Sequence, residues 1–116
     1  MSAATRRAIS HAANTVDGIT VAPYHQTVTR PGSGLVRLDH LTRDENGFGY
    51  VATWQVLILL PTDVLAAEQY LEAHLPDLLD ALAEELVIAT VTPGEYLAGD
   101  GTRIPCVVIE GHRETD

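Results

Sequence analysis

The apolar positions near the start of the chain follow first a helical period and then the pattern of a strand. Mostly small apolar residues recur on one side of a helix that Ser2 caps and Gly18 ends. These residues are Ile9, Ala12, Ala13 and Val16. Residues 19–25 then predict a short strand, in which Pro23 marks a sheet edge or a bulge. Because the apolar side of the helix is small, we expect it to dock on a larger element.

Residues 35–60 predict one long antiparallel hairpin. Its first strand alternates strictly, so that each face of the strand receives its own set of side chains. Leu35, Arg37, Asp39 and Leu41 lie on one face, and Val36, Leu38 and His40 lie on the other. The pair Asn46-Gly47 suits a tight turn. The return strand covers residues 50–60 and becomes apolar on both faces toward its end.

A second helix begins after Pro61, with Thr62 or Asp63 as its N-cap. Apolar residues at steps of three and four form one stripe along it: Val64, Ala67, Leu71, Leu75, Leu78 and Leu82. Pro76 lies inside this pattern and predicts a kink, or a split into two helices, near His74. Because the stripe continues past Pro76, we expect both halves to pack on one surface.

Two further strands complete the pattern, over residues 86–97 and 103–112, with a turn at residues 98–101. The predicted order of elements is therefore α-β-β-β-α-β-β. Strands adjacent in sequence usually pair antiparallel, so this order predicts an α+β fold with a single, mainly antiparallel β-sheet. We expect both helices on one face of the sheet, as a two-layer sandwich, and one domain over residues 1–116.

The predicted elements leave the sheet face opposite the helices without a layer to cover it. If Trp54, Val56 and Ile58 face the helices, then Leu57 and Leu59 point to the other side. Two helices can shield only one face. We therefore expect Leu57 and Leu59 to be exposed in a single chain and to be covered by a neighbouring subunit.

Composition narrows the classes of function. Hydrophobic residues make up 46% of the 116 residues, which is enough for a packed core. Seven arginines and no lysine stand against 16 acidic residues, and the net charge is −9. That balance argues against a protein that clamps nucleic acid, because such proteins present a basic surface. We also expect no membrane partner, because we find no signal peptide and no apolar run near the ~20 residues that span a bilayer.

The residue types that usually carry chemistry form no recognised pattern in this chain. The five histidines, at positions 11, 25, 40, 74 and 112, include no pair at metal-ligand spacing within one element. Cys106, the only cysteine, lies in a strand and is interpreted as a small core residue rather than a nucleophile. His40 is interpreted as a partly buried structural residue. The sequence thus predicts no catalytic residue, metal or cofactor, and we expect a protein that is not an enzyme.

Charged, aromatic and apolar side chains provide a set of candidates for contact between subunits. The set is Arg37, Arg43, Leu57, Leu59, Tyr70, Asp77, Asp80, Glu84 and Tyr96. Its acidic members lie opposite the apolar stripe of the second helix, and its two arginines would pair with that acidic surface on a neighbour. The tyrosine of the second helix falls on its polar side, and tyrosine is enriched at interfaces. The alternatives are solvated arginines and buried structural tyrosines.

Several segments, spread over nearly the whole chain, resemble the tail terminator proteins of long-tailed, siphovirus-type bacteriophages. They include the N-terminal helix and the segments TRPGSGLVRL, TWQVLILLPTD, LPDLLDALAEELVIATVTPGEYL and IPCVVIEGHRE. The resemblance lies in the order and pattern of these segments, and it carries no catalytic signature. It implies a homo-hexameric ring in the virion that caps the head-proximal end of the tail tube, stops tail polymerisation and joins the tail to the head.

The same resemblance implies the partners of such a ring. It would contact the major tail protein below and a head-completion or connector protein above. Phage DNA would pass through its lumen without specific binding, and assembly would take place in the cytoplasm of the host bacterium.

Two other functions remain open from the sequence. One is another component of the phage neck, such as a head-closure protein. The other is a small-molecule-binding α+β domain with a pocket between helix and sheet near Cys106 and His40. Tail and capsid genes beside this one would favour the phage functions.

Overall fold

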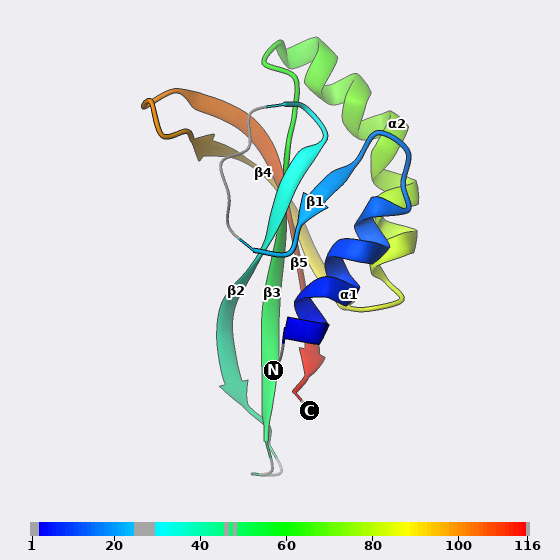
Figure 1. Cartoon of the computed structure of the whole chain (residues 1–116), viewed down its shortest axis with the longest axis vertical. Helices are drawn as coiled ribbons and strands as arrows, with labels where there is room; N and C mark the ends of the chain where they lie inside the picture. Colours follow the sequence, from blue (N-terminus) through cyan, green and yellow to red (C-terminus); the bar gives the residue numbers. More distant parts are fainter. Residues whose placement is uncertain (1–2, 25–29, 46, 48, 116) are drawn as a thin grey trace.

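The computed structural model describes residues 3–24, 30–45, 47 and 49–115. Two helices and five strands follow one another in the predicted order (Figure 1). They are α1 (Ala3–Asn14), β1 (Thr20–Ala22), β2 (Ser33–Arg43), β3 (Tyr50–Leu59), α2 (Val64–Leu82), β4 (Val87–Leu97) and β5 (Arg103–Glu114). Ser2, the predicted helix cap, His25, in the first predicted strand, and Asn46, in the predicted turn, lie outside the described residues.

The five strands form one sheet in the order β1-β2-β3-β5-β4. β1 pairs parallel with β2, and the other three strand pairs are antiparallel. Both helices lie on the same side of the sheet (Figure 1), and the main core lies between the two layers. The prediction of an α+β fold with a single, mainly antiparallel sheet is confirmed.

β1 is shorter than predicted, and α1 closes its outer edge. The side-chain amide of Asn14 takes the place of a neighbouring strand: Val21 N donates to Asn14 Oδ1 (2.6 Å), and Asn14 Nδ2 donates to Val21 O (3.2 Å). Ser10 Oγ also donates to Val21 O (2.5 Å). Pro23 follows directly after β1 and has no N–H with which to continue the ladder.

Arg6 fastens α1, a helix of mostly small residues, to the sheet. Its Nη1 donates to the carbonyl oxygens of Pro23 (3.1 Å) and Val36 (3.2 Å). Its guanidinium lies over two aromatic rings, 4.6 Å from the centre of Tyr24 and 5.2 Å from that of Trp54. Because a cation over an aromatic face is attracted by the ring quadrupole, this contact adds to the apolar packing of the helix.

A β-bulge in β2 overturns the predicted strict alternation. The pairing of β2 with β3 shifts between Leu38 and His40, so Asp39 is the extra residue and the two faces exchange beyond it. His40 pairs with Thr53 on the face opposite the helices, where its side chain is 55% exposed. The prediction of His40 as a partly buried structural residue on the Val36 face is therefore wrong.

The sheet face opposite the helices carries a second, smaller core. Its buried members are Leu35, Leu57, Leu59 and Cys106, and partly buried Tyr96, Ile104 and Val108 pack against them. Trp54, Val56 and Ile58 face the helices as predicted. Leu57 and Leu59 are only 4% and 0% exposed, so the prediction that the chain leaves them uncovered is wrong. Side chains of β4 and β5 pack against them and cover them.

α2 is one uninterrupted helix. Asp63 is its N-cap, and Ala66 N donates to Asp63 Oδ2 (3.0 Å), which confirms one of the two predicted caps. Pro76 lies inside the helix on its exposed side. There water can satisfy the carbonyl of Glu72, which has no N–H donor at Pro76. Because α2 is continuous, the predicted split near Pro76 is wrong, and the kink stays a prediction.

The apolar stripe of α2 is most deeply buried toward the C-terminal end of the helix. Its buried members are Ala67, Leu78 and Leu82, and its half-buried members are Leu71 and Leu75. Val64, the predicted first member of the stripe, is 75% exposed. The reason is that the first turn of α2 extends beyond the sheet (Figure 1).

Candidate subunit interface

Three of the predicted interface residues belong to the second core. Leu57 and Leu59 are buried in it, and Tyr96 packs against it. The structure therefore gives these residues a role within the chain. The alternative that Tyr96 is a structural tyrosine fits its place in this core.

Tyr70 lies on the inner side of α2. The prediction that it falls on the polar side of the helix is therefore wrong. It packs against the main core, and its ring makes an edge contact with His74 at 4.1 Å between centroids. Position 70 follows Ala67 by three residues, which places both on one helix face. Burial raises the pKa of the Tyr70 hydroxyl above its ordinary value.

Arg37 takes part in a row of polar side chains that crosses three strands. Its Nε donates to Gln55 Oε1, and Gln55 Nε2 donates to Glu110 Oε1 (3.2 Å). This row lies on the face opposite the helices, next to the exposed part of that face. Part of the hydrogen-bonding capacity of Arg37 is thus used within its own sheet, which weakens it as a cation for a neighbouring subunit.

Arg43 lies at the end of β2 in a different environment. Its Nη2 donates to Gly47 O (3.2 Å), and its guanidinium lies 5.8 Å from the centre of the Tyr50 ring. Tyr50 is 44% exposed, and Leu41, on the same face of the hairpin, is 41% exposed. We name Leu41, Arg43 and Tyr50 the outer hairpin surface. Neither Leu41 nor Tyr50 was predicted for the interface, and the bulge moves Leu41 from its predicted face to the face of Tyr50.

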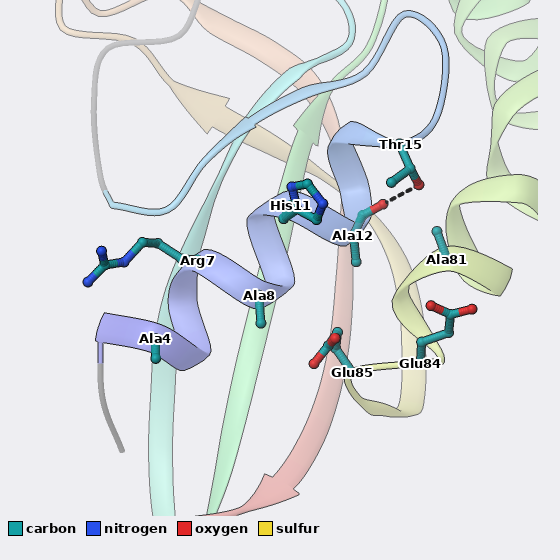
Figure 2. Close-up of a pocket in the computed structure, with 9 residues that line it drawn as sticks. All are labelled: Ala4, Arg7, Ala8, His11, Ala12, Thr15, Ala81, Glu84 and Glu85. Carbon is teal, nitrogen blue, oxygen red and sulfur yellow. Dashed lines mark hydrogen bonds between the residues drawn. The ribbon is translucent and has the colours of Figure 1, made fainter.

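The three acidic residues predicted for the interface are exposed, as predicted, and one of them lines a groove of the surface. Asp77, Asp80 and Glu84 are all exposed. Glu84 lines an open groove of about 820 Å³ between α1 and the end of α2 (Figure 2). We name this the α1–α2 groove, and its residues include Ala4, Arg7, Ala8, His11, Ala81 and Glu84.

The two walls of the α1–α2 groove carry charges of opposite sign. The cation on the α1 side is Arg7, and the carboxylates of Glu84 and Glu85 lie on the side of α2 (Figure 2). Glu85 forms a salt bridge with Arg113 Nη1 (3.0 Å). Within the described part of the chain, Glu84 and Arg7 form no ion pair. The groove therefore holds charges that a second chain can pair.

Cys106 is a buried core residue, as interpreted from the sequence. It is 1% exposed and belongs to the second core. Burial raises the pKa of its thiol above the ordinary value, and Glu95 adds to this effect while Arg37 opposes it. A thiol with a raised pKa holds little reactive thiolate at neutral pH.

We expect Cys106→Ala to fold and assemble like the native protein, with a stability loss of about 1 kcal/mol. The physical reason is that the position contributes packing and no ionised group. Denaturant unfolding and particle mass measure the two effects. A folded Cys106→Ala protein that no longer assembles would contradict this assignment.

The pocket that we considered for a small molecule does not bring its two residues together. His40 pairs with Thr53 and Cys106 pairs with Leu59, so the two sites are about 20 Å apart along β3 at about 3.3 Å per residue. An apolar groove beside Cys106, between α2 and the β4–β5 hairpin, holds about 210 Å³. That is below the roughly 300–1,000 Å³ of ordinary ligand pockets.

Among the described residues, no group of three or more His, Cys, Asp or Glu side chains is placed to hold a metal ion. In the same part of the chain, every helix is too short or too polar to cross a bilayer. Comparison of the sequence with known proteins gives no match to any family model and no match to a curated protein.

Proposed function

We propose that the chain is a structural subunit of a homo-hexameric ring at the head-proximal end of a phage tail tube. In this proposal the ring stops tail polymerisation and joins the tail to the head. Its partners are the major tail protein and a head-completion or connector protein, and it is assembled in the bacterial cytoplasm and retained in the virion neck. The resemblance in segment order supports the proposal, and the α+β fold is compatible with it.

The observation that carries the proposal is a pair of unlike exposed surfaces. The outer hairpin surface presents two large side chains and an arginine. The α1–α2 groove presents alanines between charged walls. Unlike surfaces join subunits head to tail, and such contacts close into a ring when the rotation between subunits fits. Leu57 and Leu59, which are buried within the chain, make no part of this argument.

The charge of the chain suits a channel through which DNA passes. Tight binding to duplex DNA needs several cationic contacts with phosphate, and each chain carries a net charge of −9. Arg37 already donates a hydrogen bond to a side chain of its own sheet, Gln55. We therefore expect phage DNA to pass the ring without specific binding.

Electron microscopy tests the proposal. Negatively stained protein should show rings with six-fold symmetry, and the same rings should sit on one end of purified tail tubes. The physical reason is that a head-to-tail contact with a fixed rotation gives one closed size. Fields of single small particles, together with bare tube ends, would contradict the proposal.

A head-closure protein is the second candidate, because the same pair of surfaces can build any ring of the phage neck. The two candidates differ in the partner that the ring binds. A tail terminator binds the end of the tail tube, whereas a head-closure ring binds the head side of the neck.

A further inference from the structure

The outer hairpin surface is an apolar projection with one positive charge. Leu41 pairs with Ala52 across the hairpin, and Arg43 pairs with Tyr50, so Leu41, Arg43 and Tyr50 lie on one face. This is the face on which the helices lie, but at this level the side chains of Leu41 and Tyr50 remain 41% and 44% exposed. Within the described residues, Arg43 has no carboxylate partner.

The α1–α2 groove has the complementary features. Ala4 and Ala8 lie along α1, and Ala81 lies across from them on α2 (Figure 2). Alanine side chains leave the space that larger side chains need, and the groove holds about 820 Å³. At its α2 side Glu84 offers a negative charge that no cation of the described chain takes.

The hairpin also carries negative charges next to Arg43. Asp44 and Glu45 follow Arg43 directly, at the end of the hairpin. Arg7 lines the groove from α1, and its side chain points away from α2 in Figure 2. The hairpin and the groove thus each carry charges of both signs, which allows pairing between two copies of the chain.

Both surfaces lie on the helix side of the sheet, and the end of β2 lies below α1 and the end of α2 in Figure 1. In Figure 1 the outer part of β2 lies at the left, and α1 and the end of α2 lie at the right.

We propose that the outer hairpin surface of one subunit docks in the α1–α2 groove of a second copy of this chain. Leu41 and Tyr50 lie on the alanines, and Arg43 pairs with Glu84 of the neighbour. Aromatic and arginine side chains carry much of the binding energy in many interfaces, and Tyr50 and Arg43 supply one of each. The inference rests on the proposed ring and names the contact that builds it.

Disulfide trapping tests the contact directly. In a Cys106→Ala background, the pair Tyr50→Cys and Ala8→Cys should give, on oxidation, a ladder of covalent species that ends at six chains. A head-to-tail contact requires this, because each subunit then forms one bond at its hairpin and one at its groove. Either cysteine alone should give no species above a dimer. The control pair Tyr50→Cys and Asp77→Cys, which replaces an exposed residue of α2 outside the groove, should give no ladder.

A charge exchange tests the same contact without a covalent bond. Arg43→Glu and Glu84→Arg should each weaken assembly about tenfold or more, because each places like charges together. The double variant should assemble like the native protein. Asp80→Arg, a charge change of the same size on α2 outside the groove, should have little effect. Circular dichroism shows whether each variant is folded.

The outcomes separate the contact from the ring itself. Native rings with no ladder from Tyr50→Cys and Ala8→Cys, and with no recovery in the double charge variant, overturn the docking contact and leave the ring in place. A native protein that stays a single chain and gives no ladder overturns both. A ladder with recovery in the double variant supports both.

Discussion

Leu82→Ala should reduce the free energy of unfolding by about 2–5 kcal/mol. Leu82 is 0% exposed and lies in the main core between α2 and the sheet. Removing most of its side chain loses apolar burial and leaves a cavity that the neighbouring side chains fill only in part. Small domains have a total stability of roughly 5–15 kcal/mol, so the loss would be a large share of it.

Denaturant unfolding of matched variants measures this effect. Leu78→Ala, at a position that is 2% exposed, should fall in the same range as Leu82→Ala. Val64→Ala changes an apolar residue of the same predicted stripe that is 75% exposed, and it should stay within about 0.5 kcal/mol of the native protein. Equal losses at all three positions would mean that the stripe does not pack as described.

Gly32→Ala should cost roughly 2–5 kcal/mol, for two reasons that add. The φ angle of Gly32 is +87°, a left-handed conformation that costs other residues about 1–2 kcal/mol. A Cβ atom there would overlap the carbonyl oxygen of Gly18 and lie 2.5 Å from Tyr70 Oη, and overpacking costs about 1–3 kcal/mol. Gly32 also accepts from Thr20 N (2.9 Å) and donates to Leu59 O (2.9 Å), so any shift disturbs the junction of β1 with the sheet.

Gly47→Ala separates the two causes. Gly47 has a similar φ of +78°, but an added Cβ would meet nothing within 4 Å. Its cost should therefore be the backbone part alone, about 1–2 kcal/mol. If denaturant unfolding gives the same loss for Gly32→Ala and Gly47→Ala, the close packing of Gly32 against Gly18 and Tyr70 is not as described.

The order of elements could be predicted from the sequence because each element has a local signal. The stripe of α2 and the alternation in the first residues of β2 report the period of a helix and of a strand, and both depend only on neighbours along the chain. The cap at Asp63 is equally local. These signals were enough for the α+β class and for both hairpins.

Which side chains lie on each face of a strand could not be predicted fully, because this depends on how the strand pairs with its neighbours in the sheet. The bulge at Asp39 appears only when β2 is set against β3, and it reverses the face of His40 and Leu41. The burial of Leu57 depends on side chains of β4 and β5, which are more than 30 residues away in sequence. The parallel pairing of β1 with β2 likewise has no local signal.

The candidate interface was predicted in part for the same reason. Arg43 and Glu84 were identified because exposed charges follow from helix and strand periods. Ala4 and Ala8 were missed, because a helix of small residues indicates close packing without saying against what. The α1–α2 groove exists only once Arg6 and Asn14 have placed α1 on the sheet beside α2.

The mass of the native protein in solution, measured by light scattering over a range of concentrations, tests the central claim most directly. The account predicts that the mass rises with concentration to about 75 kDa, which is six times the 12.5 kDa of one chain. A plateau at that value, without larger species, is the mark of a closed ring. A mass that stays at 12.5 kDa up to millimolar concentration would contradict the ring and the function proposed for it.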